Sequence, residues 1–196
     1  MPPARLGAMD VTEFVLAELP PPPCRVLEIG CGSGQLAEAL AQAGYRVVAI
    51  DPDAPNGPLF RRTTLENFTV PELFDAAVAS RSLHHVPELT VAVEKIGALL
   101  RRDGLLVLDE FGWERLDEPS AQEVGIDLTE WREEHDGLHT SAAMLDSLAS
   151  RFSQQRLSWE PYLYREARQA VDEARERELI ERGRLAAIGF RYAGIR

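Results

Sequence analysis

The sequence predicts an α/β fold in which a doubly wound, mostly parallel sheet carries helices on both faces. Segments typical of strands alternate with segments typical of helices through the first 110 residues, and this alternation favours a parallel sheet. The strand segments RVLEIG and YRVVAID are nearly continuous apolar runs, as in strands covered on both faces. A glycine-rich turn joins the first of these strands to the helix that follows.

Length, composition and charge limit the classes of protein that are possible. The chain has 196 residues, of which 45% are hydrophobic and 27% charged, as in one globular domain spanning residues 1–196. A net charge of -11 disfavours nucleic acid as a partner, because polyanions bind basic surfaces. No run of about 18 apolar residues is present, and no apolar run follows the early arginine, so we expect no membrane partner and a cytoplasmic location.

The expected elements follow one another in a regular order. Asp10 caps a helix over 10–19, and Gly44 ends a helix that begins near Gln35. Between Asp51 and the short strand near 59–63 the chain is too short for a helical crossover. The other predicted strands are 25–30, 45–51, 74–80, 104–110, 155–159 and 185–192, and the other predicted helices are 88–101, 119–135, 140–151 and 163–182.

The loop VLEIGCGSG predicts a nucleotide site instead of a ligand-free turn. Glycines at 30, 32 and 34 follow the first strand, Glu28 lies within that strand, and Asp51 ends the next one. A dinucleotide fingerprint needs its third glycine at position 35, which is Gln35. Glu28 would repel a phosphate but attract an ammonium group. The loop therefore favours a nucleotide with an amino group over a pyrophosphate.

Four segments in order resemble the motifs of class I S-adenosylmethionine-dependent methyltransferases: VLEIGCGSG, the acid in AIDPD, FDAAVASRSLHHV and LLRRDGLLVLDE. The resemblance is greatest to the broad small-molecule family with a Leu-His-His-Val type loop, and it covers residues 26–110. It implies a Rossmann-like sheet of seven strands with the last one antiparallel, and S-adenosylmethionine as cofactor. On this pattern, residues 26–110 form the cofactor-binding core, and 111–196 form a helical substrate-side region with the last two strands.

The same resemblance implies roles for individual residues. Glu28 and the backbone around Gly30 and Gly32 would hold the methionine end of the cofactor. Asp51 would accept hydrogen bonds from both ribose hydroxyls, and Pro52 would pack on the adenine. The adenine amino group would be met near Thr64, by Glu66 or by the backbone of Leu65. The expected cofactor set is Glu28, Gly30, Cys31, Gly32, Gly34, Asp51, Pro52, Thr64, Leu65, Ser80 and Arg81.

Candidate catalytic residues follow the carboxyl ends of the later strands. Methyl transfer is an in-line displacement that needs a general base only when the acceptor loses a proton. The candidates are His85, His139 and Glu110, and each has the alternative interpretation of a structural loop or helix-end residue, which also applies to His84. We place Trp113, His135 and Tyr164 in a substrate pocket. His135 and His139 are four residues apart, but Gly137 interrupts the helix and no third ligand is evident, so no metal site is predicted.

Together these features predict a methyltransferase for a small-molecule acceptor, at oxygen, nitrogen or carbon. The loop SRSLHH lacks the Asn-Pro-Pro-Tyr type of signature associated with methylation of bases or glutamine amides. A catalytically inactive protein that binds the cofactor and acts by interaction is an alternative, because Glu28 and Asp51 concern binding only. A nicotinamide-dependent dehydrogenase is disfavoured by Gln35 and Glu28.

Overall fold

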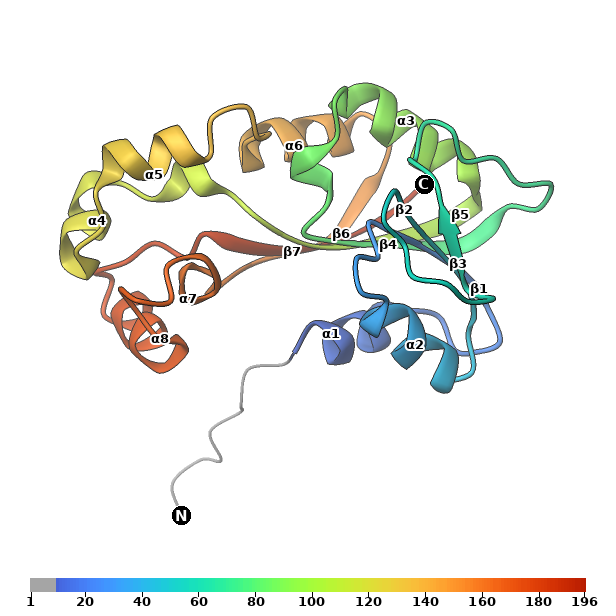
Figure 1. The fold of residues 1–196 in the computed structure, drawn as a ribbon, viewed down its shortest axis with the longest axis horizontal. Helices are drawn as coiled ribbons and strands as arrows, with labels where there is room; N and C mark the ends of the chain where they lie inside the picture. The colour runs from blue at the N-terminus through green and yellow to red at the C-terminus, as the bar shows by residue number, and fades with distance from the viewer. Residues whose placement is uncertain (1–9) are drawn as a thin grey trace, which may run out of the picture.

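The computed structural model describes residues 10–196, in which seven strands form one sheet of order β3-β2-β1-β4-β5-β7-β6 (Figure 1). Residues 1–9, which include the early arginine, lie outside the described residues. The strands are β1 (Arg25–Ile29), β2 (Arg46–Asp51), β3 (Phe60–Arg62), β4 (Phe74–Ser80), β5 (Leu100–Phe111), β6 (Ser153–Glu160) and β7 (Gly189–Ile195).

The pairing of the strands confirms the predicted class of sheet. Strands β1 to β5 pair in parallel, whereas β7 lies between β5 and β6 and is antiparallel to both. Several boundaries differ from the prediction. β7 runs from Gly189 to Ile195 instead of 185–192, and β5 runs from Leu100 to Phe111 instead of 104–110. Glu110 lies within β5, as predicted, and is buried. Full hydrogen bonding to β7 along β5 extends this strand beyond its apolar run.

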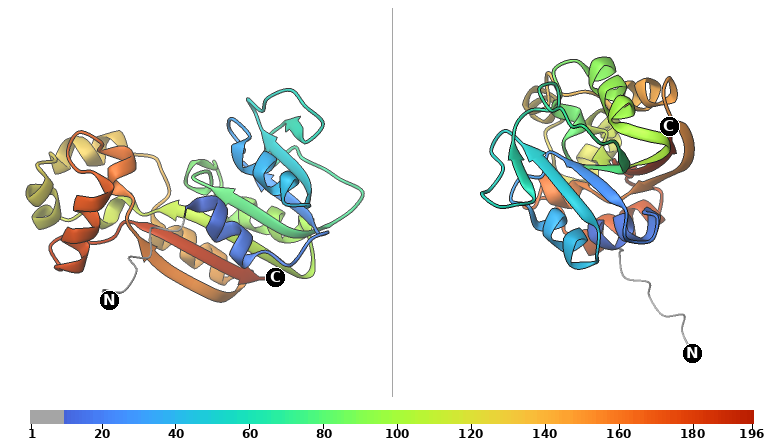
Figure 2. Two further views of the ribbon diagram at one scale, coloured as in Figure 1. Left: turned by 90° about the horizontal axis from the view of Figure 1, so that it is seen from below. Right: turned by 90° about the vertical axis from the view of Figure 1, so that its right-hand side faces the viewer.

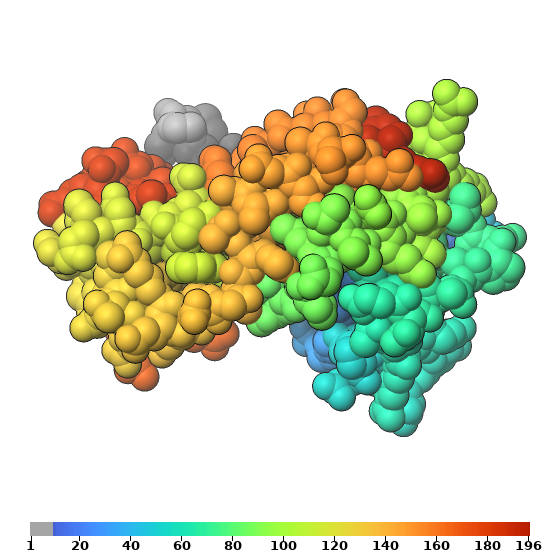
Figure 3. All heavy atoms as spheres, turned by 90° about the horizontal axis from the view of Figure 1, so that it is seen from above, coloured from blue at the N-terminus to red at the C-terminus, as the bar shows by residue number. Residues whose placement is uncertain are grey.

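Helices cover both faces of the sheet. They are α1 (Val11–Glu18), α2 (Gln35–Gln42), α3 (Leu89–Leu99), α4 (Glu118–Val124), α5 (Leu128–Glu134), α6 (Ser141–Ala149), α7 (Leu163–Glu166) and α8 (Glu173–Glu181). One apolar cluster joins the sheet to α1 and α2, through side chains such as Phe14 and Leu40, and another joins the opposite face to α3 and α6. Figure 3 shows these last two helices side by side on the surface.

The second half of the chain departs from two predicted helices. The segment 119–135 is two helices, because Gly125 takes the left-handed conformation (φ 73°) and ends α4. The segment 163–182 also divides, into α7 and α8, with residues 167–172 between them. Ion pairs of this charged segment lie within α8, for example between Arg177 and Glu173.

Helices α4, α5, α7 and α8 gather at one end of the molecule (Figures 1 and 2). A third apolar cluster holds them on the sheet, with Phe111 and Ile188 from the strand ends packed among Trp131, Tyr162 and Leu179. We call these four helices the helical lobe. The crossover from β2 to β3 contains no helix, as predicted. Among residues 10–196 no helix is long and apolar enough to cross a membrane.

Candidate cofactor and acceptor site

One cavity of about 900 Å³ lies at the carboxyl ends of the parallel strands. The ends of β1, β2 and β4 and the loops after them supply one side, and α1 contributes Val11 and Thr12. The helical lobe supplies the other side, with residues from α5 and α7. Open α/β sheets bind ligands where the strand order reverses, and here that point lies between β1 and β4. The cavity occupies this place.

The glycine-rich loop does not form a phosphate cradle. The N–H groups of Gly30 and Cys31 both donate to the carbonyl of Ile50, at 2.9 and 3.1 Å. The N–H of Gly32 donates to Asp51 Oδ2 at 3.0 Å. These donors are turned toward the neighbouring strand and not toward a ligand, which agrees with the absence of a glycine at position 35.

Two of the glycines are required by close packing. Gly30 has φ 71°, and a Cβ there would lie 2.4 Å from Ser82 Cβ. Ser82 Oγ donates to the carbonyl of Ile29, so the loop after β4 is held directly against the glycine loop. Gly34 has φ 85°, and a Cβ at this position would lie 2.5 Å from ring atoms of Phe60. It does not line the cavity, and its part in the loop is to admit this aromatic ring.

Glu28 is a buried carboxyl group that faces the cavity. Its side chain is only 3% exposed, and Oε2 has no hydrogen-bond partner among the described residues. Burial raises the pKa of Glu28 to about 8, the backbone N–H of Ala37 acts in the opposite direction, and the nearby Asp51 carboxylate raises it further. An unpartnered buried carboxyl oxygen is costly, so the group is suited to a cationic ligand atom that the protein itself does not supply.

Asp51, at the end of β2, is held in one orientation by the backbone. Oδ2 accepts from Gly32 N–H at 3.0 Å, and Oδ1 accepts from Asp53 N–H at 2.8 Å. Each carboxylate oxygen has further acceptor capacity, and the residue is only partly buried at the cavity wall. The arrangement presents two fixed acceptors, as a vicinal diol requires.

The structure brings nearly all of the expected cofactor residues into one lining. The residues in it are Glu28, Gly30, Cys31, Gly32, Asp51, Pro52, Thr64, Leu65, Ser80 and Arg81. Burial raises the pKa of the Cys31 thiol to about 12, so this sulfur is a neutral packing group. Arg81 has φ 55°, an uncommon conformation for a side chain of this size.

The far end of the cavity is aromatic. The rings of Phe111 and Tyr162 stack with centroids 4.5 Å apart, and the edge of His84 meets Phe111 at 4.9 Å. His135 also lines this end, as expected, with Nδ1 donating to the carbonyl of Trp131 at 2.7 Å. Burial raises the pKa of Tyr162, so its phenol stays neutral. The cavity lining supplied by the helical lobe also includes two carboxylates, Glu134 and Glu166.

Trp113 and Tyr164, predicted in the same pocket, lie outside its lining. Trp113 stacks on His135 from behind, with ring centroids 6.2 Å apart, and donates from Nε1 to the carbonyl of Leu138. Tyr164 lines a separate cavity of about 100 Å³ and accepts from Arg165 Nε. The aromatic residues that line the cavity are Phe111 and Tyr162 instead of Trp113 and Tyr164.

Glu110 is fully buried at the end of β5 and faces the loop after β4. Oε1 accepts from the N–H groups of Ser82 and Leu83, at 2.8 and 2.6 Å. Oε2 is 2.6 Å from His84 Nδ1. The residue does not line the cavity, so it is placed to orient this loop and not to touch an acceptor.

His139 supports the same loop from the opposite side. Its backbone N–H donates to the carbonyl of His84 at 3.0 Å, and Nε2 donates to the carbonyl of Val86 at 2.7 Å. His139 does not line the cavity, whereas His84 and His85 do. Burial, followed by the adjacent His84, lowers the pKa of His85. Of the three catalytic candidates named from the sequence, only His85 reaches the cavity.

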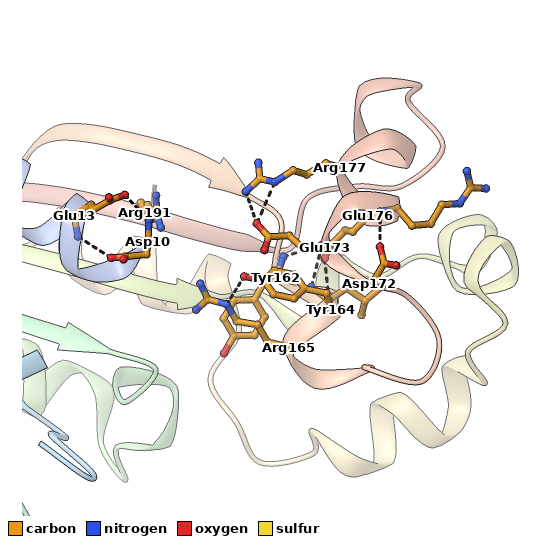
Figure 4. A network of polar contacts seen from close by, with 12 residues as sticks. Asp10, Glu13, Tyr162, Tyr164, Arg165, Asp172, Glu173, Glu176, Arg177 and Arg191 are labelled. Carbon is orange, nitrogen blue, oxygen red and sulfur yellow. Dashed lines mark hydrogen bonds and ion pairs between the residues drawn. The ribbon is translucent and has the colours of Figure 1, made fainter. Parts of the chain in front are cut away.

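A second fully buried carboxylate organises the lobe side of the cavity, and no feature of the sequence predicted it. Glu176 on α8 accepts from the N–H groups of Tyr162 and Leu163 through Oε1, at 2.7 and 2.9 Å, and from that of Tyr164 through Oε2, at 2.8 Å. Figure 4 shows Glu176 beside Tyr162 and Tyr164, with dashed lines marking hydrogen bonds between them. In the sequence Glu176 is one acid among many in a charged segment. Only its contacts in the fold distinguish it.

No group of three or more His, Cys, Asp or Glu side chains within residues 10–196 is arranged to hold a metal ion. His135 and His139 belong to different hydrogen-bond systems, as described above, since the chain turns at Gly137 (φ 88°).

The strand order and the cavity together define a Rossmann-like domain for an adenosine-type cofactor, and comparisons with known proteins give the family. A family model described as methyltransferase domain matches residues 4–159. The chain therefore belongs to the methyltransferase domain family, which confirms its resemblance to class I S-adenosylmethionine-dependent methyltransferases.

Named relatives and solved structures agree with this family. A ubiquinone biosynthesis O-methyltransferase of Bradyrhizobium diazoefficiens is 33% identical over 97 residues, which are 43% of this chain and 38% of that protein. The chain thus spans less than half the length of the named relatives it matches.

Two solved structures share the fold. One is an S-adenosylmethionine-dependent methyltransferase from Mesorhizobium loti, with a TM-score of 0.64, 19% identity and coverage of 93% of this chain and 96% of that one. The other is the geranyl diphosphate C-methyltransferase of Streptomyces coelicolor with Mg2+, geranyl diphosphate and S-adenosyl-L-homocysteine, with a TM-score of 0.64, 16% identity and coverage of 94% and 78%.

Proposed function

We propose that the protein is an S-adenosylmethionine-dependent methyltransferase that acts on a small-molecule acceptor. The observation that carries this proposal is the pairing, in one cavity, of an unpartnered buried carboxyl group at Glu28 with the two fixed acceptor oxygens of Asp51. The first suits the ammonium group of a methionine moiety, and the second suits a ribose diol. Family membership and the related structures with bound S-adenosyl-L-homocysteine support the same cofactor.

The residues of this chain would hold that cofactor along the strand ends. Glu28 and the loop at Gly30 would take the amino acid end, and Asp51 the ribose. Pro52, Thr64 and Leu65 would enclose the adenine, while Ser80 and Arg81 would lie near the sulfur. When bound, S-adenosylmethionine supplies a methyl group on a positively charged sulfur, and the protein's part is to fix the line of approach.

The aromatic end of the cavity supports a small and largely apolar acceptor. Phe111 and Tyr162 provide a stacked pair of rings, and Leu138 adds an aliphatic surface. The names of the similar proteins give different methylated atoms: one is an O-methyltransferase and the other a C-methyltransferase. These names therefore do not identify the atom that this protein would methylate. The net charge of -11 adds to the argument against nucleic acid as the acceptor.

Calorimetry on the purified protein tests the cofactor. S-adenosylmethionine and S-adenosylhomocysteine are expected to bind, and NAD is not. Binding of NAD with no response to the other two would overturn the proposal.

Transfer itself is tested with methyl-labelled cofactor and a metabolite extract. Label in a small-molecule product supports an enzyme and reveals the acceptor. Binding without any transfer would favour a catalytically inactive cofactor-binding protein instead.

A further inference from the structure

We infer that His84, oriented by Glu110, is the general base of this site, and that the acceptor therefore carries an O–H or N–H proton that it loses during methyl transfer. This inference rests on the proposed function and gives the acceptor a chemical class. The argument depends on one hydrogen bond, on the surroundings of the opposite ring nitrogen, and on the position of the loop.

The hydrogen bond fixes the tautomer of His84. Glu110 already accepts two backbone N–H groups at Oε1, and a carboxylate accepts hydrogen bonds at both of its oxygens. The proton between Glu110 Oε2 and His84 Nδ1, 2.6 Å apart, therefore belongs to Nδ1. The lone pair of the ring is then on Nε2, as in other sites where a buried carboxylate orients a histidine base.

The opposite ring nitrogen of His84, Nε2, is left without a protein partner in the described part of the chain. Within residues 10–196 it has no hydrogen-bond partner, and it is not among the buried polar atoms that lack one. The side chain is only 4% exposed, and His84 is part of the cavity lining, so this small exposure opens into the site. A buried histidine with one nitrogen fixed and the other open to a ligand cavity is arranged for proton transfer.

The loop that carries His84 is fixed between the glycine loop and the aromatic end of the cavity. Glu110 and His139 contribute five hydrogen bonds to it from opposite sides, as described above, and Ser82 joins it to Ile29 at the glycine loop. Such fixed geometry is what a base requires to meet an acceptor in line with a sulfur-bound methyl group.

The hydrogen bond between Glu110 and His84 also distinguishes His84 from the two other histidines of the cavity, because Glu110 Oε2 lies 2.6 Å from His84 Nδ1. His135 donates only to the carbonyl of Trp131. The ring of His85 has no hydrogen-bond partner within the described residues. Burial and then His84 lower the pKa of His85, while Glu110 and Glu166 act in the opposite direction. Neither of these two rings is hydrogen-bonded to a carboxylate within residues 10–196.

The proposed step is balanced as follows. The acceptor oxygen or nitrogen forms the new bond to the methyl carbon, and its proton passes to His84 Nε2. The electron pair of the broken carbon–sulfur bond remains on sulfur, which becomes a neutral thioether. His84 then returns its proton to solvent.

The tautomer can be measured without turnover. Long-range 1H–15N spectra of histidine-labelled protein with bound S-adenosylhomocysteine, assigned with His84→Gln, are expected to show His84 with the proton on Nδ1 and a bare Nε2 at pH 8. Glu110→Gln should abolish this preference. Glu176→Gln, which removes another fully buried carboxylate without touching the hydrogen bond to His84, should keep the His84 proton on Nδ1. A proton on Nε2 in the unaltered protein would overturn the inference.

Turnover gives the second readout, using the acceptor found with labelled cofactor. His84→Gln is expected to lower kcat by about 10² to 10⁴, with KM and S-adenosylhomocysteine affinity nearly unchanged, and to remove the acid limb of the pH–rate profile. His85→Gln and His135→Gln should retain that limb. Loss of the limb in either of these two variants and not in His84→Gln would assign the base elsewhere.

The two proposals fail in different ways. A product methylated at carbon would overturn the base and leave the methyltransferase intact. A protein that does not bind S-adenosylhomocysteine would overturn the proposed function, and the tautomer of His84 would then be determined on the ligand-free protein.

Discussion

Replacing Glu28 by glutamine should stabilise the ligand-free protein and weaken cofactor binding, with both effects controlled by pH. In the folded protein the pKa of Glu28 is about 8, compared with an ordinary value of 4.5. Between these two values the unfolded chain is ionised at this position while the folded protein keeps its proton. The free energy of unfolding therefore falls as pH rises from 4.5 to 8, and Glu28→Gln removes this loss.

The magnitude follows from the same two values. Each pH unit above the ordinary pKa of 4.5 lowers the free energy of unfolding by about 1.4 kcal/mol. At pH 7 the unaltered protein is therefore less stable by roughly 3 kcal/mol than it would be with a neutral side chain at this position. Urea denaturation at pH 5, 6, 7 and 8 should show Glu28→Gln gaining stability over the unaltered protein at each step. Glu94→Gln, at an exposed site on α3, is the matched control and should show a nearly constant difference.

Glu28→Gln should weaken cofactor binding, although it stabilises the ligand-free protein. A ligand ammonium group beside Glu28 favours the ionised carboxylate, so S-adenosylhomocysteine binding at pH 7 should release close to one proton. Calorimetry in buffers with different ionisation enthalpies measures this release, which should disappear in Glu28→Gln together with much of the affinity. A stability difference that stays flat from pH 5 to pH 8 would refute the reasoning about the buried carboxyl group.

Three further predictions concern other parts of the site. Asp51→Asn should weaken S-adenosylhomocysteine binding about 10- to 150-fold in calorimetry, because one hydrogen bond to a charged group is lost. Unchanged affinity would contradict the placement of the ribose at Asp51. Gly34→Ala should lower the free energy of unfolding by about 1–2 kcal/mol or more in urea, and by more than Gly32→Ala, where nothing lies within 4 Å of the added carbon. Glu176→Gln should cost about 2–4 kcal/mol and speed hydrogen exchange at residues 162–164; protection that remains unchanged would mean that these amides depend on other contacts.

The sequence was sufficient to predict the sheet and the cofactor end of the cavity because both depend on local pattern. Continuous apolar runs identify strands that are buried on both faces, and β1 and β2 lie where these runs do. Glu28, Gly30 and Asp51 are set by their positions in those strands and the adjoining turn, so parallel pairing brings them together. Their roles toward the cofactor stay predictions that the calorimetry above addresses.

The helical lobe was less predictable because its helices are short and its cavity residues come from distant segments. The division of 119–135 at Gly125 was missed, since its apolar spacing continues across the break. Tyr162 and Tyr164 are two residues apart, yet only Tyr162 faces the main cavity, since α7 turns them to different sides. Spacing alone gave no basis for choosing between them.

The sequence by itself determined the class of fold and the residues at the carboxyl ends of the first strands, since strand pattern and turn chemistry are local. Only the tertiary structure decided the roles of Glu110 and His139, which sequence reasoning placed among catalytic groups and which lie behind the loop that they hold. It also singled out His84, whose partner is 26 residues away on another strand. The physical reason is that a carboxylate's function depends on which donors surround it, and those donors meet only when the sheet has formed.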